Sequence, residues 1–230
     1  MLSLPLGPVL VAAMTHPGLM LFVAPGIAMA YGLLFGAALG LPVLMGLYAT
    51  LLVRVATAAA QFTLYERQQD RLNLLRTIPM PLSDILLSQI AAAIWNISPM
   101  LDMVLWLGGM LAPVPITIGH SMLWFDALSP VAHRFTMIAG LVTSFVRPWL
   151  ELLMAGALGT LAATLTRYRW SAATAATLLL IAYFTLINLP RLLTLPPLPR
   201  LIVEIVLPLA MPPLVTASAL GSAVRILTTD

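Results

Sequence analysis

Four ionisable residues stand inside long apolar stretches of this sequence: Arg54, Asp102, Arg147 and Glu151. An unpaired charge inside a bilayer is costly, so each of these residues is expected to be paired or to serve a function. The chemistry open to them is a structural ion pair, a proton relay or a substrate site. Arg54 and Glu151 are expected at a similar depth, and Arg147 lies one helical turn from Glu151. We therefore favour an ion pair between Glu151 and one of the two arginines.

Asp102 belongs to a second pattern, because Trp95, Pro99, Asp102 and Trp106 recur at helical spacing. One hypothesis places this stripe along the path of an amphiphilic or aromatic cargo. The simpler interpretation, which we favour, is a belt of interfacial tryptophans beside a hydrated carboxylate.

Metal binding and catalysis find little support among the remaining polar residues. His120 and His133 flank Asp126 and are conceivable ligands for a metal or haem, but histidines in such a loop are more often ordinary polar residues. The chain has no cysteine, which excludes thiol nucleophiles and cysteine-ligated metals. It also has no lysine, so the phosphate-binding lysine of a P-loop is impossible. We expect no catalytic residue, no metal and no cofactor in this chain, and ATP hydrolysis only in a separate subunit.

The composition places these residues in a membrane protein. Hydrophobic residues make up 61% of the 230 residues and charged residues only 8%, with a mean hydropathy of +1.02. A water-soluble domain carries about 25% charged residues. The arginines are scattered along this apolar chain, which is typical of topology signals and argues against a nucleic-acid partner.

The positioning elements are predicted to be helices, in an all-α integral membrane protein that forms one domain over residues 1–230. Crossing a bilayer core of about 30 Å takes roughly 20 apolar residues, and such windows can be placed six times. Their approximate positions are 18–38, 42–62, 85–108, 136–160, 171–189 and 203–225.

Two further segments are too rich in proline for a confident span. Residues 1–17 are expected to form a short interfacial segment. Four prolines interrupt the apolar residues 188–204, and an interior proline removes a backbone hydrogen bond. We therefore predict a re-entrant or interfacial element before the last span.

The arginine distribution predicts the orientation. With both termini in the cytoplasm, the cytoplasmic side holds more arginines than the outer side, as the positive-inside rule requires. The cytoplasmic set is Arg67, Arg71, Arg76, Arg167, Arg169 and Arg225, and the outer set is Arg134, Arg191 and Arg200.

The densest group of charges lies between Glu66 and Arg76. On a helix, Arg67 and Arg71 share one face, whereas Leu72 and Leu75 lie on another. The prolines that follow, in TIPMP, would end such a helix. We predict a short amphipathic cytoplasmic helix in this stretch.

The pattern E-R-x-x-x-x-L-x-L-L-R-T, followed by a proline turn and LSDILLSQI, resembles the coupling-helix loop of ABC-2 type exporter permeases. Glu66, Arg67, Leu72, Leu75 and Thr77 fall on the motif. Pro79 stands one position late because of the extra Ile78, and Asn73 replaces a residue that is commonly acidic.

This resemblance implies a transmembrane permease half of an ATP-driven exporter in a bacterial plasma membrane. The loop at about 63–82 would dock on a cytoplasmic P-loop ATPase subunit that binds the ATP, and a second permease half would complete a homo- or heterodimer. The family's cargoes are lipids, glycans, drugs or other amphiphiles. The residues implied in partner binding are Glu66, Arg67, Arg71, Leu72, Leu75 and Arg76.

Three other interpretations stay open from the sequence. The stretch from Glu66 to Arg76 could serve only as a positively charged interfacial anchor. The chain could be a non-transporting membrane subunit of a multi-subunit energy-converting complex, for which a six-span bundle with few charges would also serve. Proton-coupled carriage through Arg54 and Glu151 is a third alternative.

Overall fold

The computed structural model describes residues 17–69, 80–111, 130–193 and 195–229. Within these ranges every regular element is a helix, and four helices are long and apolar enough to cross a bilayer. A fifth crossing is formed if a bent pair of helices counts as one span. The predicted all-helical class is thus confirmed, and the apolar helices are compatible with the predicted membrane protein, whereas six separate spans are not confirmed.

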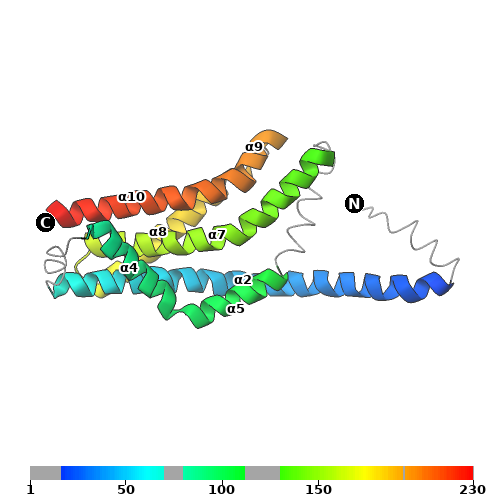
Figure 1. Cartoon of the computed structure of the whole chain (residues 1–230), viewed down its shortest axis with the longest axis horizontal. Coiled ribbons are helices and arrows are strands. Elements are labelled where there is room, and N and C mark those ends of the chain that lie inside the picture. Colours follow the sequence, from blue (N-terminus) through cyan, green and yellow to red (C-terminus); the bar gives the residue numbers. More distant parts are fainter. Residues whose placement is uncertain (1–16, 70–79, 112–129, 194, 230) are drawn as a thin grey trace.

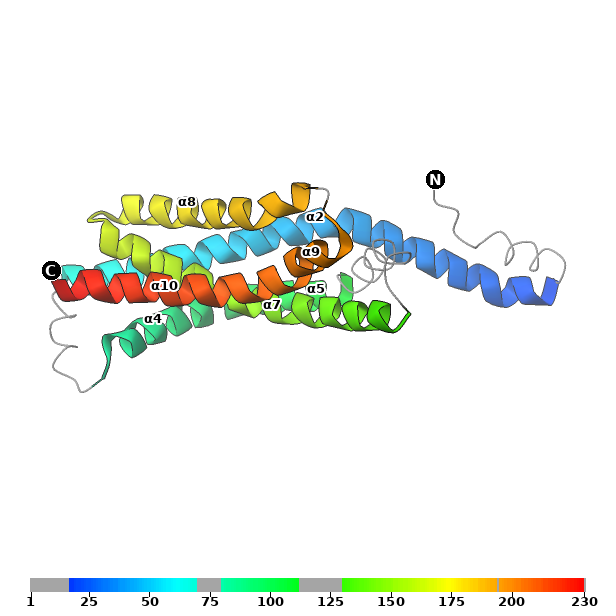
Figure 2. The ribbon, with the colours of Figure 1, turned by 90° about the horizontal axis from the view of Figure 1, so that it is seen from above.

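Helix α2 (Pro17–Gln68) is the longest element and runs through both predicted spans, 18–38 and 42–62. The second of them falls within a segment that is long and apolar enough to cross a bilayer, Pro42–Gln68. Figures 1 and 2 show that its amino-terminal half extends past the ends of the other helices. The windows were placed by length, and only Leu39, Gly40 and Leu41 separate them. None of the three is a polar residue, and α2 runs through them without reversal.

Helices α4 (Leu82–Asn96) and α5 (Ser98–Leu111) together take the place of the predicted span 85–108. Their axes differ by 70° across the break at Ile97. Pro99 follows the break and has no amide hydrogen to donate to the preceding turn, which explains why the helix cannot continue straight. Asp84 lies in the first turn of α4, where a carboxylate suits the helix dipole.

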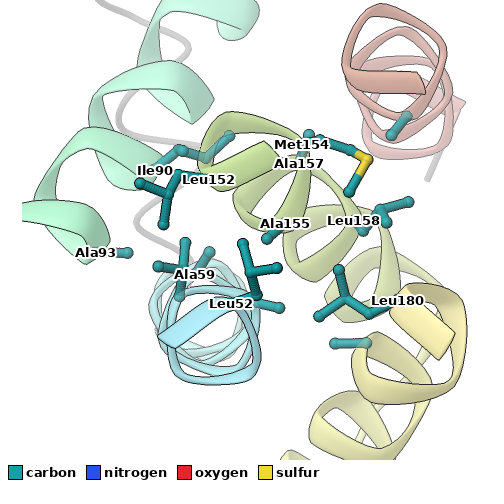
Figure 3. Packing of buried hydrophobic residues seen from close by; sticks show 14 of the residues in the cluster. Leu52, Ala59, Ile90, Ala93, Leu152, Met154, Ala155, Ala157, Leu158 and Leu180 are labelled. Carbon is teal, nitrogen blue, oxygen red and sulfur yellow. The ribbon is translucent and has the colours of Figure 1, made fainter. Parts of the chain in front are cut away.

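Helix α7 (Pro130–Leu165) is the central element, in contact with α2, α4, α8 (Arg169–Asn188) and α10 (Leu207–Thr229). Figure 3 shows its buried side chains, including Leu152, Ala155 and Leu158, between those of α2, α4 and α8. Small residues such as Ala155 and Ala59 allow these helices to approach closely. The core of the bundle is therefore built around α7.

The segment that was predicted to be re-entrant or interfacial consists of short helical elements that lead into the last span. A 3₁₀ turn, η1 (Leu189–Leu192), ends α8, and α9 (Pro197–Leu201) then continues through the π-helical η2 (Ile202–Val206) into α10. Pro197 and Pro199 fall in the first turn of α9. Prolines are tolerated there because the first-turn amides have no helical partner to lose. Residues from Pro199 to Thr229 consequently qualify as one span.

The arginines near the helix ends gather at the two opposite ends of the bundle. The carboxyl ends of α2 and α10 and the beginnings of α4 and α8 lie at one end (Figures 1 and 2). Arg67, Arg167, Arg169 and Arg225 belong to these segments. Arg134, Arg191 and Arg200 belong to the other ends of α7, α8 and α9. We call the first group's end the arginine-rich end.

Candidate functional site

The carboxyl end of α2 is joined to α4 by a chain of polar side chains at the arginine-rich end. The Gln89 amide donates a hydrogen bond to Glu66 Oε2 over 2.6 Å. The Thr63 hydroxyl lies 3.0 Å from Gln89 Oε1 and 3.0 Å from the Ala59 carbonyl oxygen, so its single proton is shared between two acceptors. Thr63 and Gln89 are both buried. A buried polar chain of this kind fixes the relative position of the two helices.

The same end of α2 is also joined to α7 and to the connection that follows it. Arg67 Nη1 donates to the carbonyl oxygen of Thr164 over 3.0 Å. Gln68 Nε2 donates to the carbonyl oxygen of Arg167 over 3.3 Å. The Thr164 carbonyl lies in the last turn of α7, where carbonyls have no helical amide to accept from. The Arg167 carbonyl lies in the connection to α8, and the two side chains satisfy both groups. Together with Gln89, these contacts define what we call the α2 end clamp: Thr63, Glu66, Arg67, Gln68 and Gln89.

The clamp includes Glu66 and Arg67, two of the residues implied in partner binding. Both residues are half-buried on the last turn of α2 and contact the bundle. The other residues implied in partner binding, Arg71, Leu72, Leu75 and Arg76, lie outside the described residues. The predicted amphipathic helix is therefore described only at its beginning, where it is continuous with α2.

A second polar cluster lies in the middle of the bundle and joins α2 to α7. Glu151 is 1% exposed, and its Oε1 accepts a hydrogen bond from Arg147 Nε over 2.6 Å. The Tyr48 hydroxyl donates to Glu151 Oε2 over 2.5 Å. The Tyr183 hydroxyl on α8 is buried without a hydrogen-bond partner among the described residues. The carboxylate is thus neutralised and hydrogen-bonded, as a buried charge requires.

Arg54 and Asp102 do not join this cluster. Both are exposed, and neither forms an ion pair within the part of the chain that the structure describes. The structure therefore brings Glu151 together with Arg147 and leaves Arg54 on another face of α2. Trp95 and Trp106 are 81% and 71% exposed, and Asp102 lies with them on the outward surface of the α4–α5 pair.

Several residues of the two clusters were missed by the sequence reasoning, which considered only ionisable groups inside spans. Gln89 and Tyr48 are uncharged, yet a polar group in lipid also needs a partner. A search for every amide and hydroxyl in the apolar windows would have found them. An ion pair at the other end of the bundle was also missed. It joins Arg191 on η1 to Glu204 on η2 over 3.4 Å.

The described residues contain no group of three histidine, aspartate or glutamate side chains that could hold a metal. His120 and Asp126 lie outside those residues, and His133 falls within α7. The proposed ligand set therefore has no described geometry.

Both clusters connect neighbouring helices, and each carboxylate in them is held by a donor from another residue. Comparisons of the chain with protein-family models, curated proteins and solved structures found no match.

Proposed function

We propose that the chain is the permease half of an ATP-driven ABC-2 type exporter, which moves an amphiphilic cargo with energy from a separate ATPase subunit. The observation that carries this proposal is the position of the motif that begins at Glu66. It begins on the last turn of the longest helix, at the point where that helix is clamped to two others.

The α2 end clamp supports this proposal because a coupling loop must transmit movement. Closure of an ATPase dimer displaces the loop, and a rigid attachment converts that displacement into a rigid-body shift of helices. Gln89 links the loop's beginning to α4, the helix that follows the loop. Arg67 links it to α7, the centre of the bundle. Displacement at the loop would therefore reach both sides of the bundle together.

The mid-bundle cluster fits a structural role within this function. Arg147 and Tyr48 hold Glu151 from two helices, and so they brace α2 against α7 in the middle of the membrane. With this brace, a shift of α2 would move α7 as well. No transfer of a proton through Glu151 is needed for this role.

Co-purification tests the proposal. The full chain, isolated from its native membrane in mild detergent, should bring with it a P-loop ATPase at one copy per permease. Leu72→Asp with Leu75→Asp should release that ATPase, because the change puts two carboxylates in place of the apolar anchors of a helix-in-groove contact. Asn73→Asp is the matched control, since it adds a carboxylate to the same loop without removing an anchor.

Two outcomes would overturn the proposal. One is a Leu72→Asp, Leu75→Asp variant that inserts normally and keeps its ATPase and its activity. The other is co-purification of redox subunits in place of an ATPase, which would support the energy-converting complex. Gln89→Leu provides a second measurement, because it breaks the clamp without touching the docking surface. It should keep the ATPase bound but lower the cargo moved per ATP hydrolysed.

A further inference from the structure

One face of α2 carries polar residues through the middle of a candidate span, Pro42–Gln68. These residues recur at helical spacing and therefore share that face: Thr50, Arg54, Thr57 and Gln61. The face points away from the bundle, since Arg54 is exposed whereas Leu52 and Val55 are buried in the core. Hydrocarbon offers polar side chains no partner, so we expect this polar stripe of α2 to be covered by a protein surface.

Arg54 is the most demanding member of the stripe. The hydroxyls of Thr50 and Thr57 donate to carbonyl oxygens of α2 itself, whereas Arg54 forms no ion pair with any described residue. It lies near the middle of the span, about 20 Å from either end. That distance is longer than an arginine side chain, so the guanidinium cannot reach water by snorkelling. Arg54 therefore needs an acidic partner at about its own depth.

Asp102 on α5 is the described carboxylate that is left for Arg54. The others are held by an arginine or lie at the arginine-rich end: Glu151 and Glu204 in the first case, Glu66 and Asp84 in the second. Asp102 is exposed and has no ion pair with a described residue. If residues 18–38 covered the stripe they would supply no anion, because they carry no charge.

Asp102 and Arg54 lie at similar depths. Helix α5 packs against α2 and runs in the opposite direction (Figures 1 and 2). Gly108 of α5 lies at the level of Leu44, whose side chain would be 3.9 Å from a Cβ on that glycine. Toward the arginine-rich end, Asp102 is six residues from Gly108, or about 9 Å, and Arg54 is ten residues from Leu44, or about 15 Å. The depths differ by about 6 Å, and each side chain leans toward the other's depth, because Cβ atoms tilt toward the amino terminus of their own helix.

A symmetric dimer would satisfy both charges at once. Two copies inserted in the same orientation are related by a two-fold axis along the membrane normal, and rotation about that axis leaves the depth of every residue unchanged. We propose that this chain forms a two-fold dimer in which Arg54 of each copy pairs with Asp102 of the other, and the polar stripe of α2 faces α5 of the partner. The guanidinium matches a carboxylate in a charge-assisted pair, and each copy supplies both members.

For the proposed exporter, this dimer would make the second permease half another copy of this chain, and that statement rests on the proposed function. The dimer itself requires no ATPase, so it is measured on the purified full chain alone. Absence of the dimer would leave the exporter proposal standing with a different permease half. A dimer of a chain that binds no ATPase would leave the interface standing without the exporter.

The test exchanges the two charges between copies. The full chain is reconstituted in phosphatidylcholine vesicles, and dimerisation is measured by energy transfer between donor-labelled and acceptor-labelled copies over a series of protein-to-lipid ratios. Arg54→Asp and Asp102→Arg each place like charges at both contacts of their own dimer, so each variant alone should dimerise more weakly by about tenfold or more. A mixture of the two variants pairs opposite charges at both contacts and should recover the affinity of the unchanged chain.

Recovery in the mixture separates pairing between copies from pairing within one chain. An ion pair inside a single chain would be restored by combining both substitutions in that chain, but not by mixing the two variants. Arg134→Asp is the matched control, since it reverses an exposed arginine that has no ion pair among the described residues. It should leave the dimer unchanged, and mixing it with Asp102→Arg should restore nothing.

A second measurement leaves both charges in place. Thr50 lies one turn from Arg54, and Trp106 lies one turn from Asp102 in the same direction along the bundle, because α2 and α5 are antiparallel. Copies with Thr50→Cys and copies with Trp106→Cys, carrying tags of different size, should therefore form a mixed disulfide on oxidation of this otherwise cysteine-free chain. Leu178→Cys on the exposed surface of α8 replaces Thr50→Cys as the control and should give no such product.

A mixture that stays as weak as its two components, although both variants are inserted and folded, overturns the proposal. So does a mixed disulfide that forms as readily with Leu178→Cys as with Thr50→Cys. Where a reversed charge prevents insertion, the disulfide between Thr50→Cys and Trp106→Cys decides alone, and its absence overturns the proposal.

Discussion

At the scale of single residues, Glu151 is the only charged side chain that is buried in the described part of the chain. Its burial is tolerated because Arg147 supplies the opposite charge and Tyr48 a further hydrogen bond. Removing one partner of a buried ion pair is more damaging than replacing the pair, since it leaves a charge without compensation. The cluster should therefore behave as a unit under mutation.

We predict that Arg147→Met destabilises the bundle by about 3 kcal/mol, because the Glu151 carboxylate is left without its counter-ion. In a double-mutant cycle with Glu151→Gln, the interaction energy should be at least about 1 kcal/mol. The matched cycle of Arg54→Gln with Glu151→Gln should be additive within about 0.5 kcal/mol. The free energy of unfolding is measured by titration with SDS in mixed micelles.

The reverse result, additivity for Arg147 and coupling for Arg54, would show that the ion pair has been assigned to the wrong arginine. Sequence reasoning placed both arginines within reach of Glu151 because it used depth along a helix alone. The face of the helix on which each arginine lies decides which of the two can pair with Glu151. Leu52, Val55 and Ala59 of α2 are buried in the core shared with α7, whereas Arg54 is exposed. That rotation depends on packing, which charge spacing does not specify.

At the scale of elements, the close crossing of α2 and α7 depends on Gly159. A Cβ added there would overlap the backbone of α2 at Ala56, which cannot move aside without shifting the helix. The three atoms nearest to a Cβ at Gly156, one turn earlier, all belong to the side chain of Ile90 on α4, which would have to move. We therefore expect an added side chain to be tolerated better at Gly156 than at Gly159.

We expect Gly159→Ala to lower the free energy of unfolding by about 1–3 kcal/mol, the usual cost of overpacking. Gly221→Ala is the matched control, because a Cβ there meets no atom within 4 Å. That substitution should raise stability by about 0.5–1 kcal/mol, as alanine favours a helix over glycine. The same SDS titration compares them, and a Gly159→Ala variant as stable as Gly221→Ala would rule out the close crossing.

Hydropathy predicted four of the six windows well. The windows 42–62, 136–160, 171–189 and 203–225 each fall within a span that the structure describes, and these spans begin at Pro42, Arg134, Arg169 and Pro199. Length and apolar content suffice where polar or proline-rich residues separate the windows. They do not suffice within 85–108, because the 70° break depends on local backbone geometry at Ile97. They also do not show that one helix continues through residues 39–41, between the windows 18–38 and 42–62.

At the scale of the whole molecule, the length of α2 conflicts with the thickness of a membrane. A helix of 52 residues is about 78 Å long, whereas the hydrocarbon core is about 30 Å thick. Residues 18–38 carry no charge. Exposing such a segment to water would forfeit about 25 cal/mol for each Å² of apolar surface.

We therefore predict that in a bilayer α2 breaks near Gly40 and Pro42, and that residues 18–38 return through the membrane as a span of their own. Glycine and proline are the residues at which helices most readily bend. The amino terminus would then lie on the same side as the arginine-rich end, which the positive-inside rule predicts to be cytoplasmic.

Single cysteines in this cysteine-free chain test the arrangement with a membrane-impermeant maleimide applied to intact cells. Ser121→Cys and Gly40→Cys should be labelled from outside, whereas Thr15→Cys and Ser171→Cys should react only after the cells are opened. Labelling of Ser171→Cys but not of Ser121→Cys from outside would reverse the orientation of the whole bundle. Labelling of Thr15→Cys from outside, with Ser171→Cys still protected, would mean that α2 crosses the membrane only once. The apolar residues 18–38 would then have to be covered outside the bilayer by another protein, because water cannot solvate them.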